Sequence, residues 1–103
     1  GLEAIWGRTV GLAERLKEGL AQIPGAKLYT PRAPELSAAL ISFGIEGWTG
    51  KELSRALREE WNMVIKALPH KREGLRASMA FFLLEDEIDK LLEALGSLAE
   101  RRR

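Results

Sequence analysis

The sequence predicts an α+β fold: a two-layer sandwich in which a small, mostly antiparallel sheet carries helices on one face. Three segments repeat apolar residues every three or four positions, as amphipathic helices do, and four others have the length and composition of strands. Strands with a strongly apolar face need helices packed on that face. We therefore expect the order helix–strand–strand–helix–strand–strand–helix. Residues 1–103, which are 46% hydrophobic, suit one domain with one core.

The first half of the chain contains a helix and two strands. Pro24-Gly25 ends the helix, and Glu14, Lys17 and Glu18 fall off its apolar stripe, on the expected solvent side. That stripe consists of Trp6, Val10, Ala13, Leu16, Leu20 and Ile23. A short strand is expected in KLYT, residues 27–30, and a longer one in SAALISFGIEG, residues 37–47. The apolar face of the longer strand consists of Ala39, Ile41, Phe43 and Ile45.

The second half begins with a helix whose start is marked by Thr49 and Glu52, the spacing of a capping box. Its buried stripe is Leu53, Ala56, Leu57 and Trp61. NMVIKAL, residues 62–68, predicts a full third strand, and a polar loop over residues 69–74 leads into a fourth strand. The last helix has acidic residues in its first turn, where the helix dipole favours them. Its buried stripe is Ile88, Leu91, Leu92, Leu95 and Leu98.

An arginine interrupts the fourth strand. Leu75, Ala77 and Met79 alternate as a buried face, so Arg76 and Ser78 fall on the opposite face. Lys66 shares that face if the third and fourth strands pair. The same face carries Leu40 and Ser42 and is mixed in polarity, so it is either solvated or rests against a second domain. With His70, Lys71 and Arg72 in the intervening loop, Lys66 and Arg76 outline an anion-facing surface, against which stands the simpler interpretation of solvated charges.

Composition and motifs exclude several classes of function. The chain has no cysteine, which rules out disulfides, thiolate metal sites and a cysteine nucleophile. His70 is the only histidine and has no carboxylate at ligand spacing, so a metal site is poorly supported, and a solvated loop residue is the favoured interpretation. No nucleophile–base pair can be assembled, and no phosphate-binding glycine motif is present. A net charge of +1 argues against nucleic acid as the main partner. No apolar run approaches the ~20 residues of a membrane span, so we expect no membrane association and a cytoplasmic location.

Four stretches together resemble the small C-terminal domain of class V aminotransferases, which are fold-type I pyridoxal-phosphate (PLP) enzymes. They are LAERLKEGLAQIPGAKLYTP, SAALISFGIEG, TGKELSRALREEWNMVIKALPH and GLRASMAFFLLEDEIDKLLEAL, and they span nearly all of residues 8–98. The last stretch is the most specific, with its Arg-x-Ser, aromatic residue and acidic helix start. The matching positions are Arg76, Ser78, Phe82, Glu87, Ile88 and Asp89. The resemblance implies that Arg76 binds the α-carboxylate of an amino-acid substrate. From their place on the same surface, Lys66, His70 and Ser78 are expected as accessory anion-facing residues.

Two departures from the family pattern refine this expectation. Family members often have Tyr-Asn-Thr before the last helix, whereas this chain has Phe82-Leu83-Leu84, which lacks both the tyrosine hydroxyl and the threonine cap. The desulfurase branch needs a cysteine in the loop before the arginine strand, and the corresponding ALPHKREG has none. The closer likeness is therefore to the isopenicillin-epimerase-like branch.

The resemblance also implies what lies outside this chain. The Schiff-base lysine, the aspartate for the pyridine nitrogen and most of the phosphate cradle belong to the family's large domain, which should precede Gly1. We therefore expect a truncated small domain from a homodimeric, PLP-dependent parent. The chain by itself should be inactive, with no bound PLP, because its lysines are expected at loop, helix-surface or open-sheet positions. The alternative is a free-standing α+β binding or regulatory module that uses the basic strand–loop–strand to bind an anion or RNA.

Overall fold

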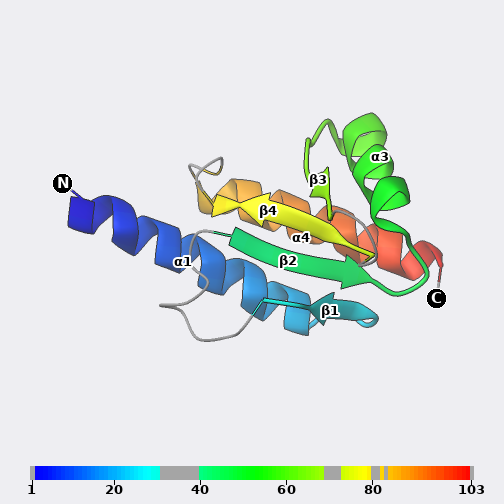
Figure 1. Ribbon diagram of the computed structural model, residues 1–103, viewed down its shortest axis with the longest axis horizontal. Coiled ribbons are helices and arrows are strands. Elements are labelled where there is room, and N and C mark those ends of the chain that lie inside the picture. The colour runs from blue at the N-terminus through cyan, green and yellow to red at the C-terminus, as the bar shows by residue number, and fades with distance from the viewer. Residues whose placement is uncertain (1, 31–39, 69–72, 80–81, 83, 103) are drawn as a thin grey trace.

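The described residues form an α+β fold in the predicted order (Figure 1). The computed structural model describes residues 2–30, 40–68, 73–79, 82 and 84–102. Their helices are α1 (Leu2–Ala21), α3 (Gly50–Trp61) and α4 (Glu85–Arg101). Their strands are β1 (Ala26–Leu28), β2 (Leu40–Ile45), β3 (Lys66–Ala67) and β4 (Leu75–Ser78). The sheet order is β1-β2-β4-β3, and each neighbouring pair is antiparallel.

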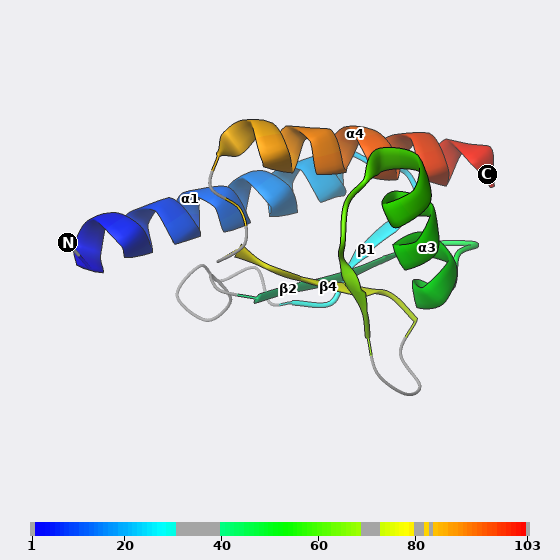
Figure 2. The same ribbon diagram turned by 90° about the horizontal axis from the view of Figure 1, so that it is seen from above.

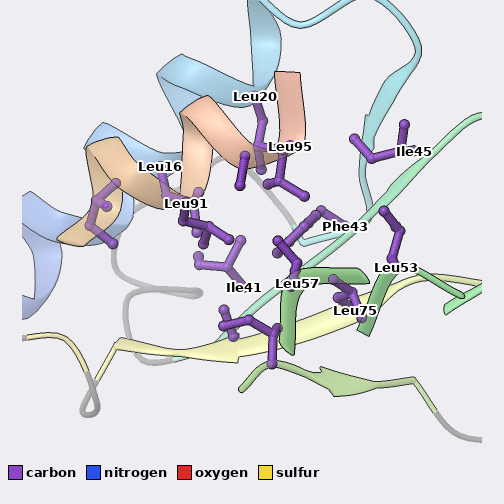
Figure 3. Close-up of a cluster of buried hydrophobic side chains, with 14 of the residues drawn as sticks. Leu16, Leu20, Ile41, Phe43, Ile45, Leu53, Leu57, Leu75, Leu91 and Leu95 are labelled. Carbon is purple, nitrogen blue, oxygen red and sulfur yellow. The ribbon is translucent and has the colours of Figure 1, made fainter. Parts of the chain in front are cut away.

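The helices lie on one side of the sheet, which gives the two predicted layers (Figure 2). The core fills the space between them, as the close-up in Figure 3 shows. Strand β2 contributes Ile41, Phe43 and Ile45, and all three are buried as the alternation predicted. Ala39, the fourth residue of that predicted face, lies outside the described residues. The opposing helical side chains include Leu16, Leu20, Leu53, Leu57, Leu91 and Leu95.

The first helix differs from its predicted stripe at both ends. Ala13, Leu16 and Leu20 are buried, but Trp6 is 52% exposed, and Ile23 lies beyond the end of the helix. The cause of the first difference is visible in Figures 1 and 2, where the N-terminal part of α1 extends past the end of the sheet. A helix face that overhangs the sheet keeps its apolar period without being buried.

The predicted third strand is also wrong in extent, because β3 contains only Lys66 and Ala67. Asn62 adopts the left-handed conformation and caps α3, which uses the first residue of NMVIKAL to end a helix. The carbonyl of Ile65 accepts a hydrogen bond of 2.7 Å from the Ser54 hydroxyl of α3. This segment is therefore bonded to the helix, and it reaches the sheet only at Lys66.

The helices α3 and α4 begin differently. Thr49 and Glu52 form the predicted capping box: the Glu52 N–H donates to the Thr49 hydroxyl at 3.1 Å, and the Thr49 N–H donates to the Glu52 carboxylate at 3.0 Å. At the start of α4, Leu84 has no side-chain acceptor, and only the Glu87 carboxylate contributes, accepting from the Leu84 N–H at 2.9 Å. The prediction that Leu84 provides no side-chain cap for the last helix is confirmed.

Helices α1 and α4 are held together by close packing and by an ion pair. Leu92 was predicted to be buried, but it is half-buried and lies over Gly19, where a Cβ atom would collide with it. Arg15 on α1 donates two hydrogen bonds of 2.8 Å to Asp89 on α4. These bonds hold the pKa of the Asp89 carboxyl below its usual value. None of the helices in the described ranges is both long and apolar enough to cross a bilayer.

Candidate functional site

The sheet register places the candidate residues in rows on the face opposite the helices. Arg76 on β4 lies between Ser42 on β2 and Lys66 on β3, and Ser78 lies opposite Leu40. Residues directly opposite each other in antiparallel strands project on the same side, with Cα atoms roughly 4.5–5.5 Å apart. The prediction that Lys66 and Arg76 share the open face as neighbours is confirmed.

Arg76 is held rigidly at its backbone and is exposed at its side chain. Its neighbours Leu75 and Ala77 are 0% and 1% exposed, so the strand cannot rotate without removing both from the core. Within the described ranges, the structure shows no hydrogen bond or ion pair for the guanidinium of Arg76 or the ammonium of Lys66. Other arginines behave differently: Arg15 and Arg101 each hold a carboxylate with hydrogen bonds of 2.7–2.9 Å. Arg76 therefore presents its donors outward.

Tyr29 covers another part of the open face. Its hydroxyl donates to the carbonyl of Glu73 at 2.9 Å, and a Cβ atom at Gly44 would come within 2.8 Å of that hydroxyl. The Glu73 carboxylate in turn accepts from the Gly50 N–H at 2.9 Å, which fixes the chain just before β4 to the start of α3. The Tyr29 ring lies over Gly44 of β2 and covers the open sheet face there. The region around Arg76 and Lys66 stays accessible.

A groove of about 990 Å³ lies beside Arg76, where β3 has ended. The Leu68 N–H bonds to the Gly74 carbonyl, so alternate residues of β4 direct their backbone groups toward β3. Ser78 continues this alternation beyond the last residue pair, and its backbone N–H and C=O face the groove. The lining comprises Leu40, residues 61–65, Lys66, Arg76, Ala77, Ser78, Phe82, Glu87 and Lys90.

Sequence reasoning missed part of this groove. Glu87 and Lys90 reach it from the first turns of α4, although the acidic start of that helix was interpreted only through the helix dipole. The signal that could have found them is their spacing of three residues, which puts both on one side of the helix. Of the accessory residues, Lys66 and Ser78 line the groove with Arg76. His70, Lys71 and Arg72 lie outside the described residues.

Lys17 was expected on the solvent side of the first helix, and this expectation was wrong. Its side chain is 0% exposed, and its Nζ lies 3.7 Å from Oε1 of Glu14. It lines a second cavity of about 490 Å³ between α1 and β1, on the other side of the molecule's sheet from Arg76. The missed signal is its place four residues after Ala13 and three before Leu20, which is within the width of a buried helix face.

The described residues contain no cluster of metal ligands, and the cavity at Lys17 does not fit the phosphate of PLP. No group of three or more potential metal ligands occurs within the described ranges. The buried amine of Lys17 has a carboxylate beside it and mostly apolar walls, without a second cation for a phosphate. The fold and site together define an α+β domain that presents a cationic, groove-flanked sheet face, and the comparisons with known proteins identify the class of that domain.

Two curated proteins are similar to almost the whole chain. The isopenicillin N epimerase of Streptomyces clavuligerus is 36% identical over 101 residues, which cover 95% of this chain and 25% of the epimerase. A probable cysteine desulfurase of Synechocystis sp. (strain ATCC 27184 / PCC 6803 / Kazusa) is 30% identical over 106 residues, covering 92% of this chain and 25% of that protein. The chain thus spans about a quarter of the length of these relatives. No protein-family model matches it.

Solved structures of larger proteins contain the same fold. The cystine C–S lyase C-DES, in complex with its product cysteine persulfide, matches with a TM-score of 0.72 and 25% identity, over 87% of this chain and 23% of the lyase. A mutant of that lyase with glycine covalently linked to the PLP cofactor matches with a TM-score of 0.67 and 24% identity, over 87% and 23% of the two chains. These findings confirm the resemblance to the class V aminotransferases: the chain is homologous to a segment of such enzymes.

Proposed function

We propose that this chain is the small domain of a PLP-dependent enzyme of the class V aminotransferase type, in which Arg76 binds the α-carboxylate of an amino-acid substrate. The observation that carries the proposal is the combination of a fixed backbone and an outward guanidinium at Arg76. The likeness to PLP enzymes over nearly the full chain supplies the class of reaction.

The chemistry expected of this face is orientation of the substrate. A planar guanidinium binds a carboxylate through two parallel N–H···O bonds, which fixes its direction as well as its position. Lys66 adds a second positive charge directly beside Arg76, and Ser78 offers a hydroxyl two residues along the same strand.

PLP supplies the electron sink for bond breaking at the substrate's α-carbon. Because the cavity at Lys17 does not fit the phosphate of PLP, we assign PLP to the remainder of a longer parent enzyme. The chain contains no cysteine, so it also supplies no thiol nucleophile for sulfur chemistry. Its proposed contribution is restricted to binding and orienting the substrate, whichever reaction the parent performs.

The test is the kinetic effect of Arg76→Lys in the full-length parent. Lysine keeps the charge and loses the planar fork, and losing one charge-assisted hydrogen bond should raise the KM for the amino-acid substrate about tenfold or more. Arg58→Gln, on the exposed side of α3, is the matched control and should leave the KM unchanged. Equal effects of the two substitutions would show that Arg76 is only a solvated residue and would contradict the proposal.

A further inference from the structure

We propose that the groove beside Arg76 binds the side chain of the substrate, and that the substrate class is therefore amino acids or peptides with a long or bulky apolar group. This inference rests on the proposed role of Arg76 in binding the carboxylate. The inference adds the direction in which the rest of the ligand extends. From Arg76, the ligand would leave the open sheet face and follow residues 61–65, which precede β3.

The groove exists because the third strand is short. Residues 63–65 would cover the outer edge of β4 if they continued β3, but the Ser54 hydroxyl holds the Ile65 carbonyl on α3 instead. The resulting space of about 990 Å³ lies at the upper end of the ~300–1,000 Å³ typical of sites for drug-sized ligands. It has room for a ligand much longer than a carboxylate with one or two carbons attached.

The walls of the groove include apolar side chains that are exposed to solvent and therefore contribute little to the hydrophobic core. Val64 is 79% exposed and Leu40 is 44% exposed, and both line the groove with half-buried Met63 and Phe82. Single exposed apolar side chains are common, but a group of them around one hollow marks a binding surface. Binding of an apolar ligand would remove them from water.

The charges lie at defined places around these walls. Arg76 and Lys66 form the cationic end, on the open sheet face, whereas Glu87 and Lys90 form the α4 wall with opposite charges that offset each other. Because these two charges offset each other, the α4 wall offers no net positive charge to a second acidic group. One carboxylate at Arg76 and an uncharged, apolar remainder therefore match the groove better than a dicarboxylate does.

The experiment titrates the 103-residue chain with sodium butanoate, hexanoate and octanoate and follows backbone amide resonances by NMR. Burial of each additional methylene should tighten binding by about threefold. Octanoate, with four more methylenes, should therefore bind about eightyfold more tightly than butanoate if all four are buried. The resonances that shift should be those of Met63 to Lys66 and Arg76 to Ser78. Octanamide, which lacks the charge, should bind more weakly than octanoate.

Two pairs of variants separate this inference from the proposed function. Val64→Ser should weaken octanoate binding several-fold and leave butanoate binding unchanged, whereas Trp6→Ser, which removes another exposed apolar side chain outside the groove, should change neither. Arg76→Gln should weaken every carboxylate, and Arg58→Gln should weaken none. If affinity is independent of chain length but depends on Arg76, the groove inference is wrong and the carboxylate role stands. If affinity rises with chain length but is the same in Arg76→Gln, the carboxylate role is wrong.

Discussion

The two faces of strand β4 carry residues with opposite exposure. Leu75 and Ala77 are almost fully buried against the helices, and Arg76 between them is exposed, with its donors directed outward. A shift of one residue along the strand exchanges these roles. This small sheet therefore differs by face: the helical side packs into the core, and the open side presents Arg76 to solvent. Substitutions on the two sides should therefore have different consequences.

The largest expected effect is on the helical side, from Phe43→Ala. The ring is 0% exposed at the centre of the core, so its removal should lower the free energy of unfolding by about 3–5 kcal/mol. Chemical denaturation followed by circular dichroism measures this loss. Ser42→Ala, the adjacent residue on the open face, is the matched control, and a similar loss there would contradict the division between the faces.

An effect of intermediate size is expected at the two helix starts. Thr49→Ala removes an acceptor for the Glu52 N–H and should lower the free energy of unfolding by about 1 kcal/mol. Leu84→Thr supplies the acceptor that α4 lacks and should raise it by about the same amount or less. Thermal melts compare the two variants with the parent sequence. A Leu84→Thr protein that melts lower than the parent sequence would show that Leu84 is needed for packing.

A smaller, pH-dependent effect is expected from the ion pair between α1 and α4. The bonds from Arg15 lower the pKa of Asp89 in the folded state below its unfolded value, so this carboxylate stabilises the fold above the unfolded pKa. That contribution is lost as the pH falls through the folded pKa. In Arg15→Gln, the pKa of Asp89 should rise toward 3.8. A carboxyl NMR titration measures it, with Arg55→Gln on α3 as the control. If the pKa of Asp89 is unchanged in Arg15→Gln, its lowered value would be due to the dipole at the start of α4 and not to Arg15.

The smallest expected effect on stability is at Arg76, on the open face of the sheet. Arg76→Gln and Arg76→Lys should each change the free energy of unfolding by less than about 0.5 kcal/mol, because the side chain is exposed and bonded to nothing else within the described ranges. Denaturation of both variants measures this. A loss well above that value would mean that Arg76 supports the fold, and a binding defect in the same variants would then need another explanation.

The fold could be predicted from the sequence wherever the spacing of apolar residues alone decides which face is buried. The core face of β2 alternates with a period of two, and the core face of α4 repeats with a helical period at Ile88, Leu91 and Leu95. The prediction failed where a contact distant in sequence decided the outcome. The strand at NMVIKAL is shortened by a hydrogen bond from Ser54, and Trp6 is exposed because the helix extends past the end of the sheet.

The site could be predicted in part for a similar reason. Strand alternation placed Arg76 and Ser78 on one face, and the register then brought Lys66 beside Arg76 as expected. The groove could not be predicted, because it results from the shortness of β3 and from the approach of α4. The burial of Lys17 was missed because its charge was taken as a sign of solvent exposure, although the long aliphatic part of a lysine packs well in a core.

The central claim is that Arg76 is the residue on this domain that receives a carboxylate. The most direct measurement is the NMR signal of the guanidinium Nε–H of each arginine while acetate and then octanoate are added to the 103-residue chain at constant ionic strength. If Arg76 receives the carboxylate, its signal should shift saturably, with a lower Kd for octanoate than for acetate, and the Arg58 signal should not shift. Shifts of equal size at Arg76 and Arg58 that do not saturate would contradict it.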